Sequence, residues 1–172
     1  MLVFIKLLRS LVKTLHSDGT PAQIAFGIAL GAALGLTPIV NAHNLIVLFL
    51  LCVLNVSFAA GLFAWALFVP IGFVLDPLFD RLGHWLLVGQ PALRPFWASW
   101  DSVPGLALTN FNNTVVLGSV VAWLVLFIPL YFASRLGVTR YRASIGERVR
   151  NSRYYKLLEA SQIYNVYRWF RP

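Results

Sequence analysis

An apolar segment at residues 24–36 carries glycine at every fourth position, at Gly27, Gly31 and Gly35. On a helix this spacing places the three glycines on one stripe, where no Cβ separates the backbone from a neighbouring element. A helix of this length rises only about 20 Å, which is less than the bilayer's hydrocarbon core of about 30 Å. The pattern therefore predicts a short, apolar helix that packs closely against a partner and does not cross a membrane by itself.

Helix start and stop signals frame this segment. Thr20 suits an N-cap, Pro21 the first helical position, and Gln23 a capping box. The helix should end before Pro38, because the residue preceding a proline avoids the α region. A second short apolar run follows at residues 45–54. The two runs predict either a re-entrant hairpin or two tilted short crossings, and we favour the hairpin.

Two later apolar stretches are longer. Residues 57–75 contain Pro70, which should kink a helix. The Asp-Pro pair at residues 76–77 is expected to start a new helix. Residues 115–133 carry no charge and are long enough to span a bilayer. The intervening residues 89–109 are rich in proline, glycine and tryptophan, which predicts a loop near the membrane interface.

The two ends of the chain are basic. Cations alternate with apolar residues at a helical period in residues 1–18, which predicts an amphipathic interfacial helix. From residue 135 onward the chain contains nine basic residues and only two acidic ones. We expect an interfacial helix (1–18), a membrane domain (19–134) and a basic cytoplasmic tail (135–172). Because basic juxtamembrane segments mark the cytoplasmic side, both termini are expected there.

Composition supports a membrane protein. Hydrophobic residues make up 59% of the chain and charged residues 12%, against about 45–50% and about 25% in soluble domains. We predict an all-α, polytopic, multi-pass protein of the bacterial inner membrane, with short half-helices. The net charge of +8 lies near the ends, where it suits anionic lipid. We expect no nucleic-acid partner.

Two groups of residues are candidate binding sites. The glycine stripe could hold a lipid chain or a partner's helix, or it could pack within the subunit. The turn after it carries Thr37, Asn41, His43 and Asn44. Because non-helical backbone at membrane depth needs hydrogen-bond partners, these side chains either satisfy the turn or form a pocket for a headgroup or ion.

A third group is ionisable and comprises Asp76, Asp80, Arg81 and His84. Asp80 and His84 are four residues apart and share a helix face. Ionisable groups inside a membrane indicate a proton or substrate pathway, whereas at the interface they form a solvated helix end. We find no spacing typical of metal ligands, of a cofactor motif or of a catalytic triad, and we therefore expect no metal, no cofactor and no catalytic residue.

One bacterial family has the same pattern. The proline-led segment at residues 21–31, the glycine, threonine and proline at residues 35–38, and the apolar run from Leu45 to Asn55 resemble the small inner-membrane proteins grouped as "domain of unknown function 2062". The stretch containing Trp65 and Pro70 is similar to that family's third segment. The resemblance covers residues 20–90, and the His43-Asn44 pair departs from it. Since the family's domain can occur beside glycosyltransferase modules, the resemblance implies a role in envelope lipid or polysaccharide metabolism.

Three hypotheses follow. The first is a noncatalytic inner-membrane subunit that binds lipid or a partner's transmembrane helix along the glycine stripe, in envelope lipid or glycan handling. That partner would be another membrane protein or a second copy of the chain. The second is a small transporter or lipid flippase that uses the polar turn at residues 37–44 and the cluster at residues 76–84. The third is a lipid-modifying enzyme that uses Asp80 and His84.

Overall fold

The computed structural model describes residues 19–38, 41–101, 103 and 105–146, and the regular elements in these ranges are all helical. The main helices are α2 (Pro21–Leu36), α3 (Ala42–Val53), α4 (Phe58–His84), α5 (Arg94–Asp101) and α6 (Thr114–Tyr141). Short π and 3-10 turns follow or precede them at Trp85–Gly89, Pro91–Leu93, Leu106–Thr109 and Arg142–Gly146. The expected interfacial helix at residues 1–18, and the tail beyond residue 146, lie outside the described residues.

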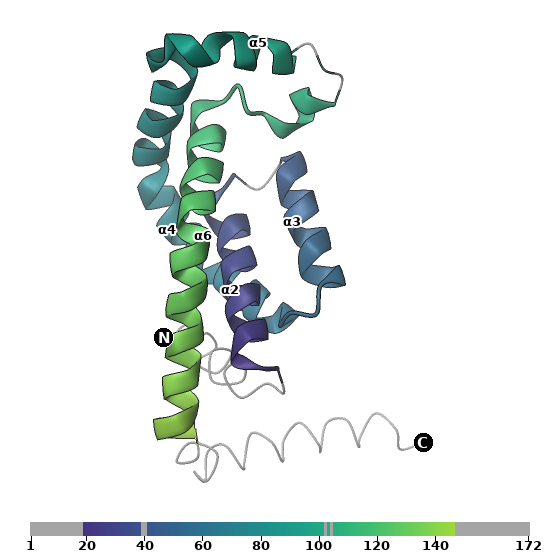
Figure 1. The fold of residues 1–172 in the computed structure, drawn as a ribbon, viewed down its shortest axis with the longest axis vertical. Helices are drawn as coiled ribbons and strands as arrows, with labels where there is room; N and C mark the ends of the chain where they lie inside the picture. Colours follow the sequence, from purple (N-terminus) through teal and green to yellow (C-terminus); the bar gives the residue numbers. More distant parts are fainter. Residues whose placement is uncertain (1–18, 39–40, 102, 104, 147–172) are drawn as a thin grey trace.

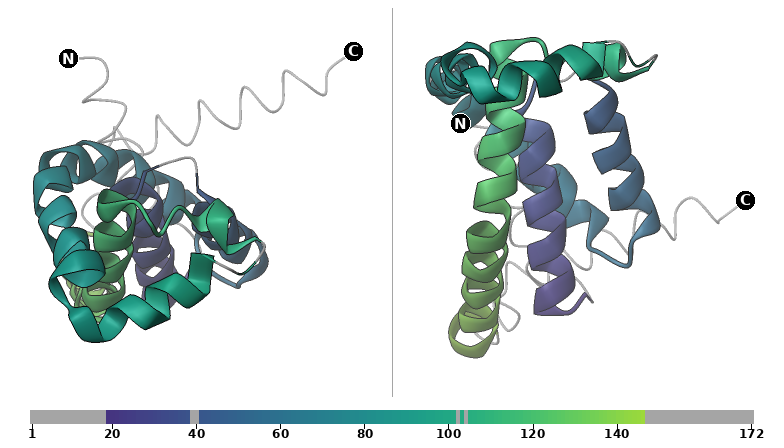
Figure 2. Two further views of the ribbon diagram at one scale, coloured as in Figure 1. Left: turned by 90° about the horizontal axis from the view of Figure 1, so that it is seen from above. Right: turned by 45° about the horizontal axis from the view of Figure 1, so that its top comes forward.

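The helices form a bundle in which α2 of a short hairpin is central and α3 lies at one edge (Figure 1). The chain runs along α2, turns, and returns along α3. α4 then runs parallel to α2, and α6 runs antiparallel to it (Figure 1). α5 lies crosswise over one end of the bundle, as both views in Figure 2 show. α2 is the central element, because it packs against α3, α4 and α6 and is buried along most of its length.

The predicted limits of α2 are confirmed. The Thr20 hydroxyl accepts a hydrogen bond from the Gln23 amide at 3.2 Å, and the Gln23 side-chain oxygen accepts one from the Thr20 amide at 2.8 Å. These two bonds make the capping box that the sequence indicates. α2 ends at Leu36, before Pro38, and α3 occupies the second short apolar run.

The prediction of a break near residue 76 is wrong. Pro70 and Pro77 both lie inside one continuous helix, α4, so Asp76 is not the cap of a new helix. A proline removes a single backbone donor, and the neighbouring turns of a long apolar helix retain their own hydrogen bonds. The ionisable cluster at residues 76–84 therefore belongs to the last turns of α4.

Two further boundaries differ from prediction. Residues 94–101, expected in a loop, form α5, whose aromatic side chains pack together; the Phe96 and Trp97 ring centroids lie 4.9 Å apart. α6 continues to Tyr141, beyond its predicted end and past the expected domain boundary at residues 134/135. Arg135 does not end the helix, because an exposed arginine is a good helix former.

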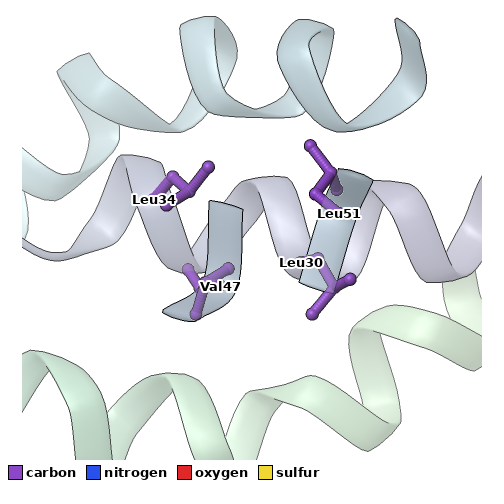
Figure 3. Packing of buried hydrophobic residues seen from close by; sticks show 5 residues of the cluster. Leu30, Leu34, Val47 and Leu51 are labelled. Atoms are coloured by element: carbon purple, nitrogen blue, oxygen red, sulfur yellow. The ribbon is translucent and has the colours of Figure 1, made fainter. Parts of the chain in front are cut away.

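The core of the hairpin lies between its two short helices. Leu30 and Leu34 of α2 meet Val47 and Leu51 of α3 in one buried cluster (Figure 3). Trp123 of α6 also packs against this cluster, and its indole donates a hydrogen bond to the Ala29 carbonyl at 2.9 Å. The hairpin is thus attached to the long helices by both apolar packing and a side-chain hydrogen bond.

Two helical segments are long and apolar enough to cross a membrane, Phe58–Gly89 and Thr114–Ser144. They contain 32 and 31 residues, or about 47 Å of helix each. α2 and α3, with 16 and 12 residues, reach only about 24 Å and about 18 Å. The long pair and the short pair therefore differ in length by about a factor of two.

Candidate functional site

The glycine stripe of α2 faces α4 of the same chain. A Cβ built on Gly35 would lie 2.8 Å from the Trp65 carbonyl oxygen, and one built on Gly31 would overlap the Gly61 carbonyl group. Gly27 lies in the same way against the Ser57 carbonyl. All three glycines allow two parallel backbones to approach closely, which is the packing alternative that the sequence left open.

α4 fills the stripe along its whole length. The three glycines are buried, and Gly72 of α4 extends the contact, since a Cβ there would lie 2.6 Å from the Gly35 carbonyl oxygen. The expectation of a groove along this stripe for a lipid chain or a partner's helix is therefore corrected: in the folded chain the groove is occupied by α4.

A second close contact joins α4 to α6 and was missed in the sequence. A Cβ on Gly118 would lie 2.7 Å from the Phe79 carbonyl carbon, and one on Gly83 would meet the Thr114 backbone. Gly83 and Gly118 belong to different helices, so they show no regular four-residue spacing in the sequence. Only the pairing of α4 with α6 could have revealed the contact.

Side chains of the polar turn bond to one another and to the Pro38 carbonyl. The Thr37 hydroxyl donates to the Asn44 side-chain oxygen at 2.7 Å, and the Asn44 amide donates to the Pro38 carbonyl at 2.7 Å. The Asn41 side-chain amide reaches the same carbonyl at 2.8 Å. These bonds stabilise the chain reversal between α2 and α3. The structure thus brings three of the four predicted turn residues together in one network.

The network extends to the segment before α6. The Asn110 side-chain amide donates to the Asn41 side-chain oxygen at 2.7 Å. Asn110 has a φ of 53°, a left-handed conformation that asparagine adopts more readily than most residues. This long-range bond, between residues 69 positions apart, holds residues 105–113 over the tip of the hairpin.

His43 is the fourth turn residue and has a different environment. Its ring stacks on Phe111 with centroids 5.9 Å apart and planes 9° from parallel. Both ring nitrogens are enclosed, and neither makes a hydrogen bond of normal geometry with a described residue. Burial lowers the pKa of His43, and a weaker interaction with the Thr109 backbone opposes the shift. His43 lies in the first turn of α3, outside the two long helices.

Aromatic rings connect this tip to α5. Phe111 packs against Trp100, with centroids 5.5 Å apart, and Trp100 packs against Phe96 and Trp97. The Trp97 indole donates to the Leu86 carbonyl at 3.0 Å. The rings thus form a continuous cap over the hairpin tip, anchored to the π turn at Trp85–Gly89 that follows α4.

The ionisable cluster lies apart from the turn's hydrogen-bond network. Asp80 accepts a hydrogen bond from the Thr114 hydroxyl of α6. Asp80, Arg81 and His84 are exposed, and Asp76 is partly exposed. Within the described part of the chain, no hydrogen bond or ion pair joins Asp80 to His84, and no three His, Cys, Asp or Glu side chains gather as metal ligands.

Comparison with known proteins places the chain in a family. The family model described as "Uncharacterized protein conserved in bacteria (DUF2062)" matches residues 6–145. The chain belongs to this family. A protein of Treponema pallidum (strain Nichols) that carries the name "Uncharacterized protein" is 33% identical over 153 residues, which are 86% of this chain and 91% of that protein. No solved structure matches.

Membership in the DUF2062 family confirms the resemblance and extends it. The matched residues run from before α2 to the end of α6, whereas the sequence motifs covered only residues 20–90. The long helices, the hairpin and the aromatic cap therefore all lie inside the family domain.

One surface of this DUF2062 domain was not singled out in the sequence. α3 buries only Asn44, Val47 and Leu51, and its opposite side is apolar and exposed. Leu45 is 70% exposed and Phe49 is 62% exposed. The nearly uniform hydrophobicity of residues 45–54 conceals which side packs, so the sequence alone could not separate the buried stripe from the exposed one.

Proposed function

We propose that this chain is a polytopic protein of the bacterial inner membrane that binds lipid without catalysing a reaction, in envelope lipid handling. The supporting observation is a belt of large apolar side chains exposed on α3, α4 and α6. Only 22% of the most apolar window of each long helix is buried, whereas the core helix of a soluble protein would be mostly buried. An apolar surface of this extent is costly in water and favourable in a bilayer. Its members include Leu45, Ile46, Phe49, Phe73, Val74, Leu124, Val125, Ile128 and Phe132.

Charge supports one orientation in that membrane. Arg135, Arg140 and Arg142 lie at the end of α6 where α2 begins, since Val138 packs against Ile24. A basic juxtamembrane end belongs in the cytoplasm by the positive-inside rule. In this arrangement α4 and α6 cross the bilayer, and the α2–α3 hairpin enters from the cytoplasmic side and returns to it. Both termini are then cytoplasmic.

The lipid-binding surface that we propose is the exposed side of α3. The glycine stripe is covered by α4, so it is not available to a ligand. α3 packs mainly on α2 and leaves its outer side free in the described structure. A transporter that links the turn to the ionisable cluster has less support, because the hydrogen bonds of the turn lead to Asn110 and those of Asp80 lead to Thr114.

Retention of native lipid tests the proposal. The protein would be extracted from bacterial membranes in a mild detergent and its bound lipids measured by native mass spectrometry. Phe49→Ala removes a ring that is 62% exposed on α3, and the control Phe132→Ala removes one that is 57% exposed on α6. We expect phospholipid on the wild-type protein and on the control, and a loss of at least half of it from Phe49→Ala.

Two results would contradict the proposal. Equal lipid retention by the two alanine variants would show that α3 holds no preferred lipid. A stoichiometric protein at α3 in place of lipid would favour the hypothesis of a partner's transmembrane helix.

A further inference from the structure

The apolar side of α3 is much shorter than a bilayer is thick. α3 has 12 residues and rises about 18 Å, and polar residues lie at both of its ends. Asn41 precedes the helix at the turn, and Asn55 follows it. The hydrocarbon core of a bilayer is about 30 Å thick. Along this face the protein therefore offers about 12 Å less apolar length than a bilayer requires.

The tip of the hairpin can be placed against α4. Thr37 bonds to Asn44 at 2.7 Å, so the start of α3 is level with the end of α2. That end is level with Gly72, because a Cβ on Gly72 would lie 3.1 Å from the Leu36 Cα. α4 then continues from Gly72 to His84, about 18 Å farther. The hairpin tip thus lies partway across the span of the long helices.

Polar groups begin directly beyond this tip. The Asn110 side chain bonds to Asn41, and both Asn110 and Asn112 are exposed. Residues 110–113 have turn backbone that is not part of a helix. Non-helical backbone and amide side chains are not tolerated against lipid tails. Water and headgroups therefore reach the end of α3. At the same height α4 carries no charged side chain up to Leu75, with Asp76 one turn beyond Gly72, and α6 carries none from Thr114 to Ser134.

Building on the proposed lipid-binding surface, we propose that the bilayer is thinned beside α3 and that phospholipids cross there between the two leaflets. The headgroup passes along the exposed Asn110 and Asn112 side chains next to the tip, which shortens its path through hydrocarbon. The acyl chains stay against Leu45, Ile46 and Phe49. The movement is passive, since no bond is made or broken. Thinning to accommodate a short apolar face is the usual response of a bilayer to mismatch.

Two spin labels at the same height test the thinning. In a Cys52→Ser background, Leu45→Cys places a label at the tip end of α3, and Phe73→Cys places a matched label on the exposed side of α4, next to Gly72. After reconstitution into phosphatidylcholine vesicles, we expect a water-soluble nickel complex to collide with the label at residue 45 several times more often than with the label at residue 73. Equal burial of both labels in oxygen-rich hydrocarbon would overturn the inference and leave lipid binding intact.

Lipid exchange tests the crossing itself. In vesicles containing fluorescent phosphatidylcholine, external dithionite bleaches only the outer leaflet unless lipids exchange. We expect the protein to accelerate exchange at least about tenfold over lipid-only vesicles, which corresponds to a barrier lower by about 1.4 kcal/mol. The rate should fall when longer acyl chains thicken the bilayer.

Three outcomes separate the two proposals. Absence of accelerated exchange in all bilayers overturns the inference even when native lipid is retained. If the wild-type protein retains no native lipid, and nickel reaches both the label at residue 45 and the label at residue 73, the proposed function is overturned as well. Cys52 lies exposed on α3, so efficient disulfide formation between two copies of the wild-type chain would show a second copy on this face, and would also overturn the inference.

Discussion

Replacing Gly31 by alanine tests the central contact of the fold. The added Cβ would meet the Gly61 backbone, with the carbonyl carbon at 2.8 Å and the Cα at 2.9 Å. Backbone atoms cannot move aside as a side chain can, so α2 and α4 must separate. Overpacking of this kind costs about 1–3 kcal/mol, and alanine returns about 0.5–1 kcal/mol of helix propensity. We expect a net loss of about 1–2 kcal/mol in the free energy of unfolding.

Gly137→Ala in α6 is the matched control, because a Cβ there meets nothing within 4 Å. It should be neutral or slightly stabilising. Thermal unfolding in detergent, followed by the fluorescence of the six tryptophans, should show Gly31→Ala about 2–8 °C below the wild-type protein. If the two variants were equally stable, α2 and α4 would not be in contact at Gly31. Unchanged stability together with altered lipid retention would instead support a lipid-facing stripe.

Two other substitutions test the attachment of the hairpin. Burial lowers the pKa of His43 below its ordinary value of about 6.5. As the pH falls, His43 is therefore protonated at a higher pH in the unfolded chain than in the folded one. The free energy of unfolding should decrease as the pH drops below about 6.5. His43→Phe keeps a ring for Phe111 and should remove this part of the pH dependence in thermal unfolding; an unchanged dependence would contradict the assignment. Trp123→Phe removes the indole hydrogen bond to Ala29 and should cost about 0.5–1.5 kcal/mol. Trp85 is exposed, so the control substitution Trp85→Phe should leave the free energy of unfolding unchanged. If both substitutions lowered it equally, the hydrogen bond from Trp123 to Ala29 would not stabilise the fold.

The parts of the fold that follow from local chemistry could be predicted from the sequence. The capping box at Thr20 and Gln23, the stop before Pro38 and the two short helices all depend on residues within a few positions of one another. The glycine spacing correctly indicated a close backbone contact. Each of these signals acts over one or two helical turns, which is the distance at which sequence patterns carry structural information.

The parts that depend on distant residues could not be predicted. Nothing in the glycine stripe says whether α4, a lipid or another protein covers it, since all three would favour the same bare backbone. Pro70 and Pro77 are strong helix breakers in water, but α4 continues through both. The bond from Asn110 to Asn41 joins residues 69 positions apart. Such choices are made by packing partners that the local sequence does not identify.

The two helices of the hairpin have opposite surroundings, and their side chains explain why. α2 is rich in glycine and alanine, so α3, α4 and α6 can all approach it, and it is enclosed on nearly every side. α3 carries leucine, isoleucine and phenylalanine on the side that no described helix covers. Substitutions that enlarge a side chain should therefore destabilise the fold along α2 and be tolerated along the outer side of α3. The same asymmetry leaves the outer side of α3 at the periphery of the bundle, where the surrounding medium meets an apolar face about 18 Å long.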